Sequence, residues 1–136
     1  MTQKQFWMKL DQISSKEMTI ERLTDFVNTI ILAYRENLSL YCLVLQDSLD
    51  ADECKQMYIG PFDRRYLICF SSMRKAKLPP KENLEVTGYV CVQQIAVREI
   101  VDNALNKDVI SGLIFNKDSA HPYIVDKEIL EPFVRM

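Results

Sequence analysis

The sequence predicts an α+β fold, a single domain whose mixed sheet of about five strands is covered by helices. Three observations predict it. Apolar residues recur at helical spacing over residues 1–37, continuous apolar runs follow in the middle of the chain, and a strand, a helix and a strand succeed one another near its end. We therefore expect an N-terminal helical extension over residues 1–37, with the sheet and its covering helices over residues 38–136.

Two helices are predicted in the N-terminal part. In residues 3–13, apolar side chains recur every three or four positions, and Ser14-Ser15 ends the pattern. Thr19 is a suitable N-cap for a second helix, because its hydroxyl can accept a hydrogen bond from a free backbone N–H of the first turn. That helix is expected to run to about Asn37, a residue that tolerates the backbone conformation in which helices often end.

The rest of the chain alternates strand signals with turns and helices. Strands are expected over residues 40–45, 57–59, 65–70, 86–95, 110–115 and 123–125. The uninterrupted apolar character of residues 40–45 and 65–70 is typical of strands covered on both faces. Helices are expected over residues 73–77 and 96–106, and a last one is expected after Asp126. The acidic stretch between the first two strands is predicted to be a connection.

Composition narrows the class of protein. The chain has 136 residues, 48% of them hydrophobic, which suits one core better than two. The 17 basic and 19 acidic residues give a net charge of −2, so no concentrated positive field marks a nucleic-acid partner. The longest apolar runs are far shorter than the ~20 residues that cross a bilayer. The first ten residues lack the apolar stretch of a secretory signal, so a cytoplasmic protein without membrane contact is expected.

The residue types that commonly bind metals occur without suitable spacing. None of the four cysteines forms a Cys-x-x-Cys pair or has a histidine nearby, as a zinc site would require. We expect them to be reduced and structural. The acidic residues between positions 47 and 53 lack the mid-loop glycine of a calcium-binding loop. No metal and no cofactor are predicted.

The sequence also lacks the residue combinations of a catalytic site. His121 is the single histidine, and it precedes Pro122 in a polar loop. Cys54 has acidic neighbours, which disfavour the thiolate that a nucleophilic cysteine needs. We therefore predict that the chain is not an enzyme, and we assign no catalytic residue.

Two short motifs resemble the N-terminal domain of the SseB family, a bacterial family named for enhanced serine sensitivity. The first is Tyr-Leu-Ile-Cys-Phe-Ser-Ser at residues 66–72, and the second is Gly-Leu-Ile-Phe-Asn at residues 112–116. Ser71 stands where the family usually has Thr, and Lys117 stands where Pro is common. The resemblance covers residues 40–133 and does not reach the first two helices. It implies a cytoplasmic bacterial α+β domain, without an established activity and without a catalytic residue to carry over.

One candidate ligand site surrounds the first motif. If Ser71 or Ser72 opens a helix, its backbone amides together with Arg74 and Lys75 could receive an anion such as a phosphate. The alternative is an ordinary basic, solvent-exposed face, and no glycine-rich loop brings the backbone close to a phosphate.

A candidate interface lies at the N-terminus, where Phe6 and Trp7 are large apolar residues near the chain end. They either cover the core or form an exposed patch of the kind that marks a binding surface. The sequence leaves both alternatives open.

The function predicted from these observations is that of a non-catalytic interaction module of SseB type. It would bind another protein or itself, with a homodimer as one form. The alternative is a domain that binds a small anion or metabolite at Ser71-Ser72 and the adjacent basic residues.

Overall fold

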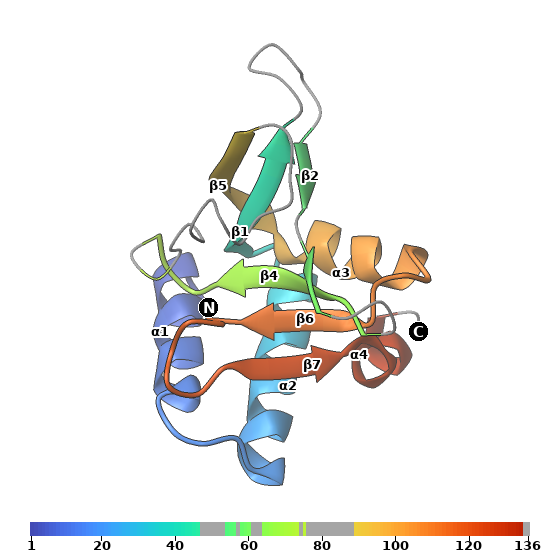
Figure 1. The fold of residues 1–136 in the computed structure, drawn as a ribbon. Helices are drawn as coiled ribbons and strands as arrows, with labels where there is room; N and C mark the ends of the chain where they lie inside the picture. Colours follow the sequence, from blue (N-terminus) through green and yellow to red (C-terminus); the bar gives the residue numbers. More distant parts are fainter. Residues whose placement is uncertain (47–53, 57, 61–63, 74, 76–88, 135–136) are drawn as a thin grey trace.

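The computed structural model describes residues 1–46, 54–56, 58–60, 64–73, 75 and 89–134. Its helices are α1 (Gln3–Ser14), α2 (Ile20–Arg35), α3 (Val97–Asn106) and α4 (Lys127–Val134). Its strands are β1 (Ser39–Gln46), β2 (Cys54–Gln56), β3 (Tyr58–Ile59), β4 (Tyr66–Phe70), β5 (Tyr89–Ala96), β6 (Gly112–Phe115) and β7 (Tyr123–Asp126). The predicted mixed α+β class is confirmed (Figure 1).

The first two helices begin and end where their capping residues predict. The Thr2 hydroxyl accepts a hydrogen bond from the Gln5 amide, and the Gln5 side chain accepts one from the Thr2 amide, so α1 opens with a capping box. Thr19 caps α2 by accepting from the amide of Arg22. Asn37 follows α2 with φ 57°, the left-handed conformation that terminates a helix.

The sheet consists of two parts that meet at one short contact. In the first part, β1 pairs antiparallel with β5 along its whole length and with β2 near its end. In the second part, β4 pairs parallel with β6, β6 pairs antiparallel with β7, and β3 pairs with β4. Only Tyr41 and Cys42 of β1 pair with Phe70 and Cys69 of β4. The strands of the first part therefore run across those of the second (Figure 1).

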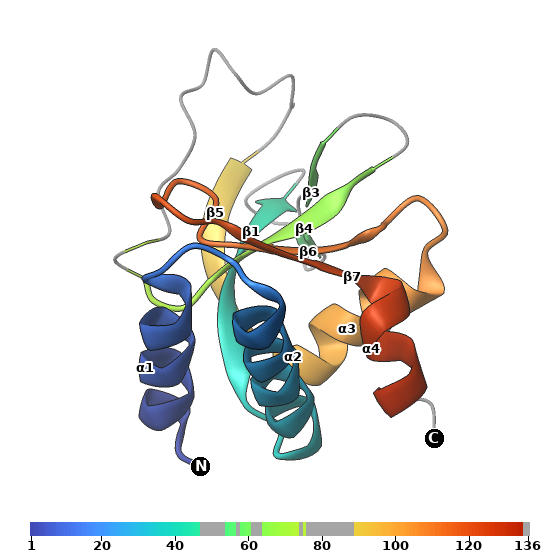
Figure 2. The ribbon, with the colours of Figure 1, turned by 90° about the horizontal axis from the view of Figure 1, so that it is seen from below.

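The four helices of the described residues all lie on one face of the sheet (Figure 2). The core lies between them and that face, and side chains from both N-terminal helices fill it. The fully buried large residues of this core include Phe6, Leu10, Phe26, Ile30, Leu40, Leu67, Ile100, Leu113, Phe115 and Tyr123. The predicted N-terminal extension is thus an integral part of the core.

The opposite face of the sheet carries a second apolar cluster, which we call the outer cluster. Its fully or nearly fully buried members are Leu43, Ile68 and Phe70. Partly buried side chains surround them: Tyr41, Leu45, Val90, Val92 and Ile114. Because β1 and β4 contribute to clusters on both faces, the prediction that these two strands are covered on both sides is confirmed.

The observed elements differ from the predicted ones in two places. The described residues form seven strands, one more than the six ranges that the sequence predicts, because β2 lies where a connection was predicted. Of the helix expected over residues 73–77, the structure describes Met73 and Lys75, which lie in a turn closed by a hydrogen bond from the Lys75 amide to the Ser72 carbonyl. The remainder of that prediction, and residues 86–88 of the expected strand, lie outside the described residues.

Cys42 and Cys69 lie directly opposite each other on β1 and β4, and both are buried. A hydrogen bond with Cys42, together with burial, raises the pKa of the Cys69 thiol well above its ordinary value. Both thiols are free, as expected for cysteines that act as small apolar side chains.

The raised pKa of Cys69 predicts a loss of stability at alkaline pH. The folded state keeps the thiol protonated, whereas the unfolded chain releases the proton above about pH 8.5. Each pH unit above that value should therefore lower the free energy of unfolding by about 1.4 kcal/mol, until the folded pKa is reached. Urea unfolding between pH 8 and 10 should show a shallower decline for Cys69→Ala than for the wild type. Parallel declines would contradict the prediction.

Candidate functional site

A polar cluster lies at the carboxyl ends of the parallel strands β4 and β6. Ser71 follows β4 and Asn116 follows β6, so parallel pairing brings two positions 45 residues apart together. The amide of Ser71 donates to Asn116 Oδ1 at 3.1 Å, and Asn116 Nδ2 donates to Ser71 Oγ at 3.2 Å. Both residues are buried. Asn116 has φ 51°, and its own amide donates to the Cys69 carbonyl.

Helix α1 and the turn after β4 complete this cluster. The Ser71 hydroxyl donates to Asp11 Oδ1, and the Lys75 ammonium lies 2.8 Å from the same carboxylate oxygen. Because Asp11 belongs to α1, these contacts attach that helix to the ends of two strands. The side chains of Lys75 and Asp11 are 41% and 35% exposed, so this ion pair contributes little by itself. The buried hydrogen bonds of Ser71 and Asn116 contribute most of the stabilisation.

The groups predicted to bind an anion are thus hydrogen-bonded or paired with other groups of the same chain. Ser71 donates through its amide and its hydroxyl, Lys75 pairs with Asp11, and Ser72 Oγ accepts a hydrogen bond from the Lys75 amide. Arg74 lies outside the described residues. A phosphate placed here would face the Asp11 carboxylate, which repels it. Anion binding at these residues stays a prediction, and the geometry favours a structural role for Ser71.

One member of this cluster, Asp11, could not be predicted from the sequence. Asn116 was part of a motif, but nothing near Asp11 in the sequence distinguishes it from other exposed positions of a helix. Its contact with Ser71 spans 60 residues and depends on how α1 packs against the sheet. Only a pattern linking positions 11 and 71 across related sequences would have indicated it.

Phe6 and Trp7 contact their own chain. Phe6 is fully buried in the core, so for this residue the structure shows the first of the two alternatives left open. Trp7 is partly buried, its ring lies 5.1 Å from the ring of Tyr41, and its Nε1 donates to the Ser39 carbonyl at 2.8 Å. Trp7 therefore anchors α1 to the first residues of β1, and Phe6 packs in the core.

The two residues considered for catalysis lie apart in the fold. His121 is partly buried and lies two residues before β7, whereas Cys54 begins β2. Within the ranges that the structure describes, no cluster of three or more histidine, cysteine or carboxylate side chains is arranged to hold a metal ion. In the same ranges, no helix combines the length and the apolar character needed to cross a membrane.

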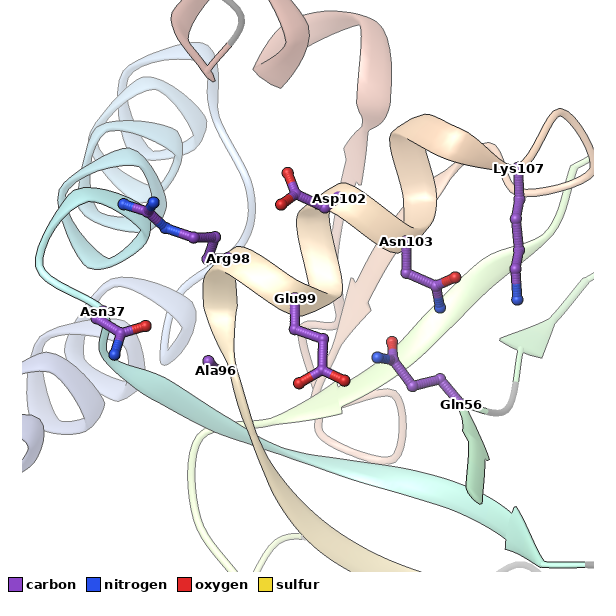
Figure 3. A pocket seen from close by; sticks show the side chains of 8 residues that line it. All are labelled: Asn37, Gln56, Ala96, Arg98, Glu99, Asp102, Asn103 and Lys107. Carbon is purple, nitrogen blue, oxygen red and sulfur yellow. The ribbon is translucent and has the colours of Figure 1, made fainter. Parts of the chain in front are cut away.

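A hollow of about 600 Å³ lies beside α3 and was not predicted from the sequence. Figure 3 shows its lining, which consists of Asn37, Gln56, Ala96, Arg98, Glu99, Asp102, Asn103 and Lys107. Arg98 lies over the Tyr34 ring and donates to the Tyr34 carbonyl, while the Tyr34 hydroxyl donates to Asp102. Its lining residues are polar or charged except for Ala96 and carry both signs of charge, whereas small-molecule sites are lined mainly by apolar and aromatic side chains.

Among the described strands, β5 lies at an edge of the sheet, and its composition is unusual. Its eight residues, Tyr-Val-Cys-Val-Gln-Gln-Ile-Ala, include no charged side chain and no proline. It pairs with β1 along its whole length, and no other described strand pairs with it. Natural sheets usually protect such edges with lysine, proline or a bulge, because unpaired backbone groups are a template for another strand.

One backbone hydrogen bond shows which residues of β5 direct their amides and carbonyls toward β1. The Val97 amide donates to the Leu38 carbonyl at 2.7 Å, in register with the β1–β5 ladder. Residues of an antiparallel strand alternate between facing toward and away from their partner. The backbone amides and carbonyls of Val90, Val92 and Gln94 therefore point away from β1.

The comparisons with known proteins add no family to this picture. No family model, no curated protein and no solved structure matches the chain. The proposed function therefore rests on the fold and on the sites described above.

Proposed function

We propose that this chain is a non-catalytic, cytoplasmic interaction module of SseB type that binds protein by accepting a β-strand along β5. The observation that carries the proposal is the eight-residue edge without charge or proline. An added strand would satisfy the outward amides and carbonyls of Val90, Val92 and Gln94 by main-chain hydrogen bonds.

The side chains beside this edge suit a protein partner. Val90 and Val92 are partly buried and belong to the outer cluster, on the face opposite the described helices. A strand paired with β5 would place its own alternate side chains next to them on that face. Backbone hydrogen bonds would then give affinity, and these apolar neighbours would favour apolar residues in the partner.

The hydrogen bonds of the polar cluster support the SseB-type proposal, because they join the two resembling motifs. Ser71 comes from the first of the two resembling motifs and Asn116 from the second, and they hydrogen-bond to each other. Both motifs thus serve to join the ends of neighbouring strands. Motifs with this purpose require neither a substrate nor a catalytic residue, in agreement with an interaction module.

Affinity capture with edge variants tests the proposal. Gln94→Pro removes a backbone N–H that points away from β1, so it blocks the edge while leaving the β1–β5 hydrogen bonds in place. Gln94→Ala changes the same exposed side chain and keeps the amide, which makes it the matched control. We expect proteins captured from a bacterial lysate by the wild type and Gln94→Ala, this chain included, to be lost with Gln94→Pro. Identical captured sets for all three would contradict strand acceptance at β5.

A further inference from the structure

We propose that Cys42 and Cys69 are a site of reversible oxidation, at which a peroxide joins the two thiols in one disulfide between β1 and β4. This inference goes beyond the proposed function and does not depend on strand acceptance at β5. The disulfide would link the two parts of the sheet covalently, because β1 and β4 are the strands at which these parts meet.

The backbone places the two cysteines at the closest kind of cross-strand position. Cys42 and Cys69 are direct partners in the antiparallel pairing of β1 and β4. The Val97 amide donates to the Leu38 carbonyl, so by alternation the backbone groups of Cys42 point toward β5 and away from β4. On the other strand, the Cys69 carbonyl accepts a hydrogen bond from the Asn116 amide, which follows β6. The two cysteines therefore form a non-hydrogen-bonded pair, the kind in which side chains approach most closely.

This spacing is within the reach of a disulfide. The Cα atoms of a non-hydrogen-bonded antiparallel pair lie about 4.5 Å apart. Disulfides join Cα atoms that are roughly 4.4–6.8 Å apart. Both cysteine side chains belong to the core cluster beneath the helices, so they lie on the same face of the sheet. The Cys42 side chain also hydrogen-bonds that of Cys69 and thereby helps to raise the pKa of the Cys69 thiol. The two sulfur atoms are thus neighbours already in the reduced chain.

The other two cysteines are placed less favourably. Cys91 on β5 lies opposite Val44, which makes it a diagonal neighbour of Cys42. Diagonal residues are about 7–8 Å apart, beyond the ordinary reach of a disulfide. Cys54 lies opposite Gln46, which is separated from Cys42 by roughly 13 Å along β1. The register therefore favours the pair across β1 and β4.

The proposed step is a two-electron oxidation in which the atoms balance. One thiolate attacks the O–O bond of hydrogen peroxide and becomes a sulfenic acid, and the hydroxide that leaves takes up a proton to form water. The second thiol attacks the sulfenic sulfur, forms the S–S bond and releases a second water. Two thiols and one peroxide thus give one disulfide and two waters. A dithiol reverses the reaction by exchange and is itself oxidised to a disulfide.

Burial determines when these thiols react. Both side chains are buried, and the raised pKa of the Cys69 thiol keeps it protonated, so the closed junction is unreactive. In the described register, β1 and β4 pair at two positions only, and Tyr41 with Phe70 is the other. Local opening of this short junction would expose both sulfur atoms together. We therefore expect slow oxidation of the folded chain and, in a reducing compartment, a transient disulfide.

Mass spectrometry after treatment with hydrogen peroxide tests the inference. In native buffer, the full-length chain carrying Cys54→Ser and Cys91→Ser should lose about 2 Da, the mass of the two thiol hydrogens, and dithiothreitol should restore it. The matched control carries Cys54→Ser and Cys69→Ala, so it keeps two cysteines in the diagonal arrangement and should not lose this mass. Digestion of the oxidised wild type without reduction should release linked peptides that contain Cys42 and Cys69. This wild-type result does not depend on the folding of any variant.

Oxidation of the wild type in urea separates the folded geometry from chance encounters. In an unfolded chain, closing a longer loop costs more entropy, so cysteines near each other in the sequence pair preferentially. Cys54 is 12 residues from Cys42 and 15 from Cys69, whereas Cys42 and Cys69 are 27 residues apart. Disulfides of Cys54 should therefore predominate in urea, and the disulfide of Cys42 with Cys69 should predominate in native buffer. Another predominant disulfide in native buffer, or sulfinic acids without a disulfide, would overturn the inference.

The melting temperature shows whether the folded junction accommodates the bond. A disulfide that closes a loop of this length should raise the melting temperature of the oxidised chain by roughly 10 °C above that of the reduced chain. An oxidised chain that melts below the reduced one would overturn the inference, because the bond would then be incompatible with the pairing of β1 and β4.

Discussion

Asn116→Ala should destabilise the protein by about 3 kcal/mol, because it removes the partners of a buried backbone group and leaves a strained backbone. The Ser71 amide, now hydrogen-bonded to Asn116 Oδ1, would stay buried without that acceptor. Ser71 Oγ would also lose the donor Nδ2. In addition, alanine would have to adopt φ 51°, a left-handed conformation that asparagine tolerates better.

Two further variants separate these contributions. Asn37 has φ 57° but is exposed, so Asn37→Ala should cost only the backbone term, about 1 kcal/mol. Asn116→Gly removes the hydrogen bonds but relieves the backbone, and should fall between the two alanine variants. Urea unfolding of all three measures the differences. Equal losses for Asn37→Ala and Asn116→Ala would show that the contacts with Ser71 contribute nothing.

Gly112→Ala should destabilise the protein by about 3 kcal/mol or more, because there is no space for its methyl group between β6 and β7. A Cβ atom at this position would lie 2.1 Å from the Val125 carbonyl oxygen and 2.9 Å from the Asp126 Cα. Both are backbone atoms of the paired strand, so no side-chain rotation can relieve the clash. The two strands would have to separate at their first register pair, Gly112 and Asp126.

Thermal unfolding provides the measurement. A loss of this size should lower the melting temperature by roughly 10 °C for a domain of this length. Ser111→Ala is the control at the neighbouring position, since the hydrogen bonds that Ser111 makes to Arg65 and Lys127 use its backbone. It should melt within a few degrees of the wild type. A melting temperature of Gly112→Ala equal to that of Ser111→Ala would contradict the close approach of β6 and β7.

Helix caps and other features that depend on residues close together in the sequence were the easiest to predict. The N-caps at Thr2 and Thr19 act on amides three residues away, and only the second was identified in advance. β2 was missed because Cys54–Gln56 has no strand pattern of its own and is held in the sheet by pairing with β1. After Ser71 and Ser72 the sequence predicted a brief helix, whereas the described residues Met73 and Lys75 lie in a turn. The contact of Ser71 with Asp11 was not predicted either, because it joins positions 60 residues apart.

Strand β5 shows the same difference between what the sequence reveals and what depends on the tertiary structure. The composition of residues 89–96 can be read directly, and it shows an uncharged strand. Whether such a strand lies in the middle of a sheet or at its edge depends on which strands pair with it. Its position beside β1 alone, among the described strands, makes the missing charges meaningful.

By itself, the sequence determined the fold class, the order of most helices and strands, and which strands are apolar on both faces, because short-range periodicity and capping specify these properties. Only the tertiary structure decided that β1 joins two crossing parts of the sheet, that Asp11, Ser71 and Asn116 form one cluster, and that β5 lies at an edge of the described strands. These features depend on contacts between residues far apart in the chain, and such contacts form only when the whole core packs.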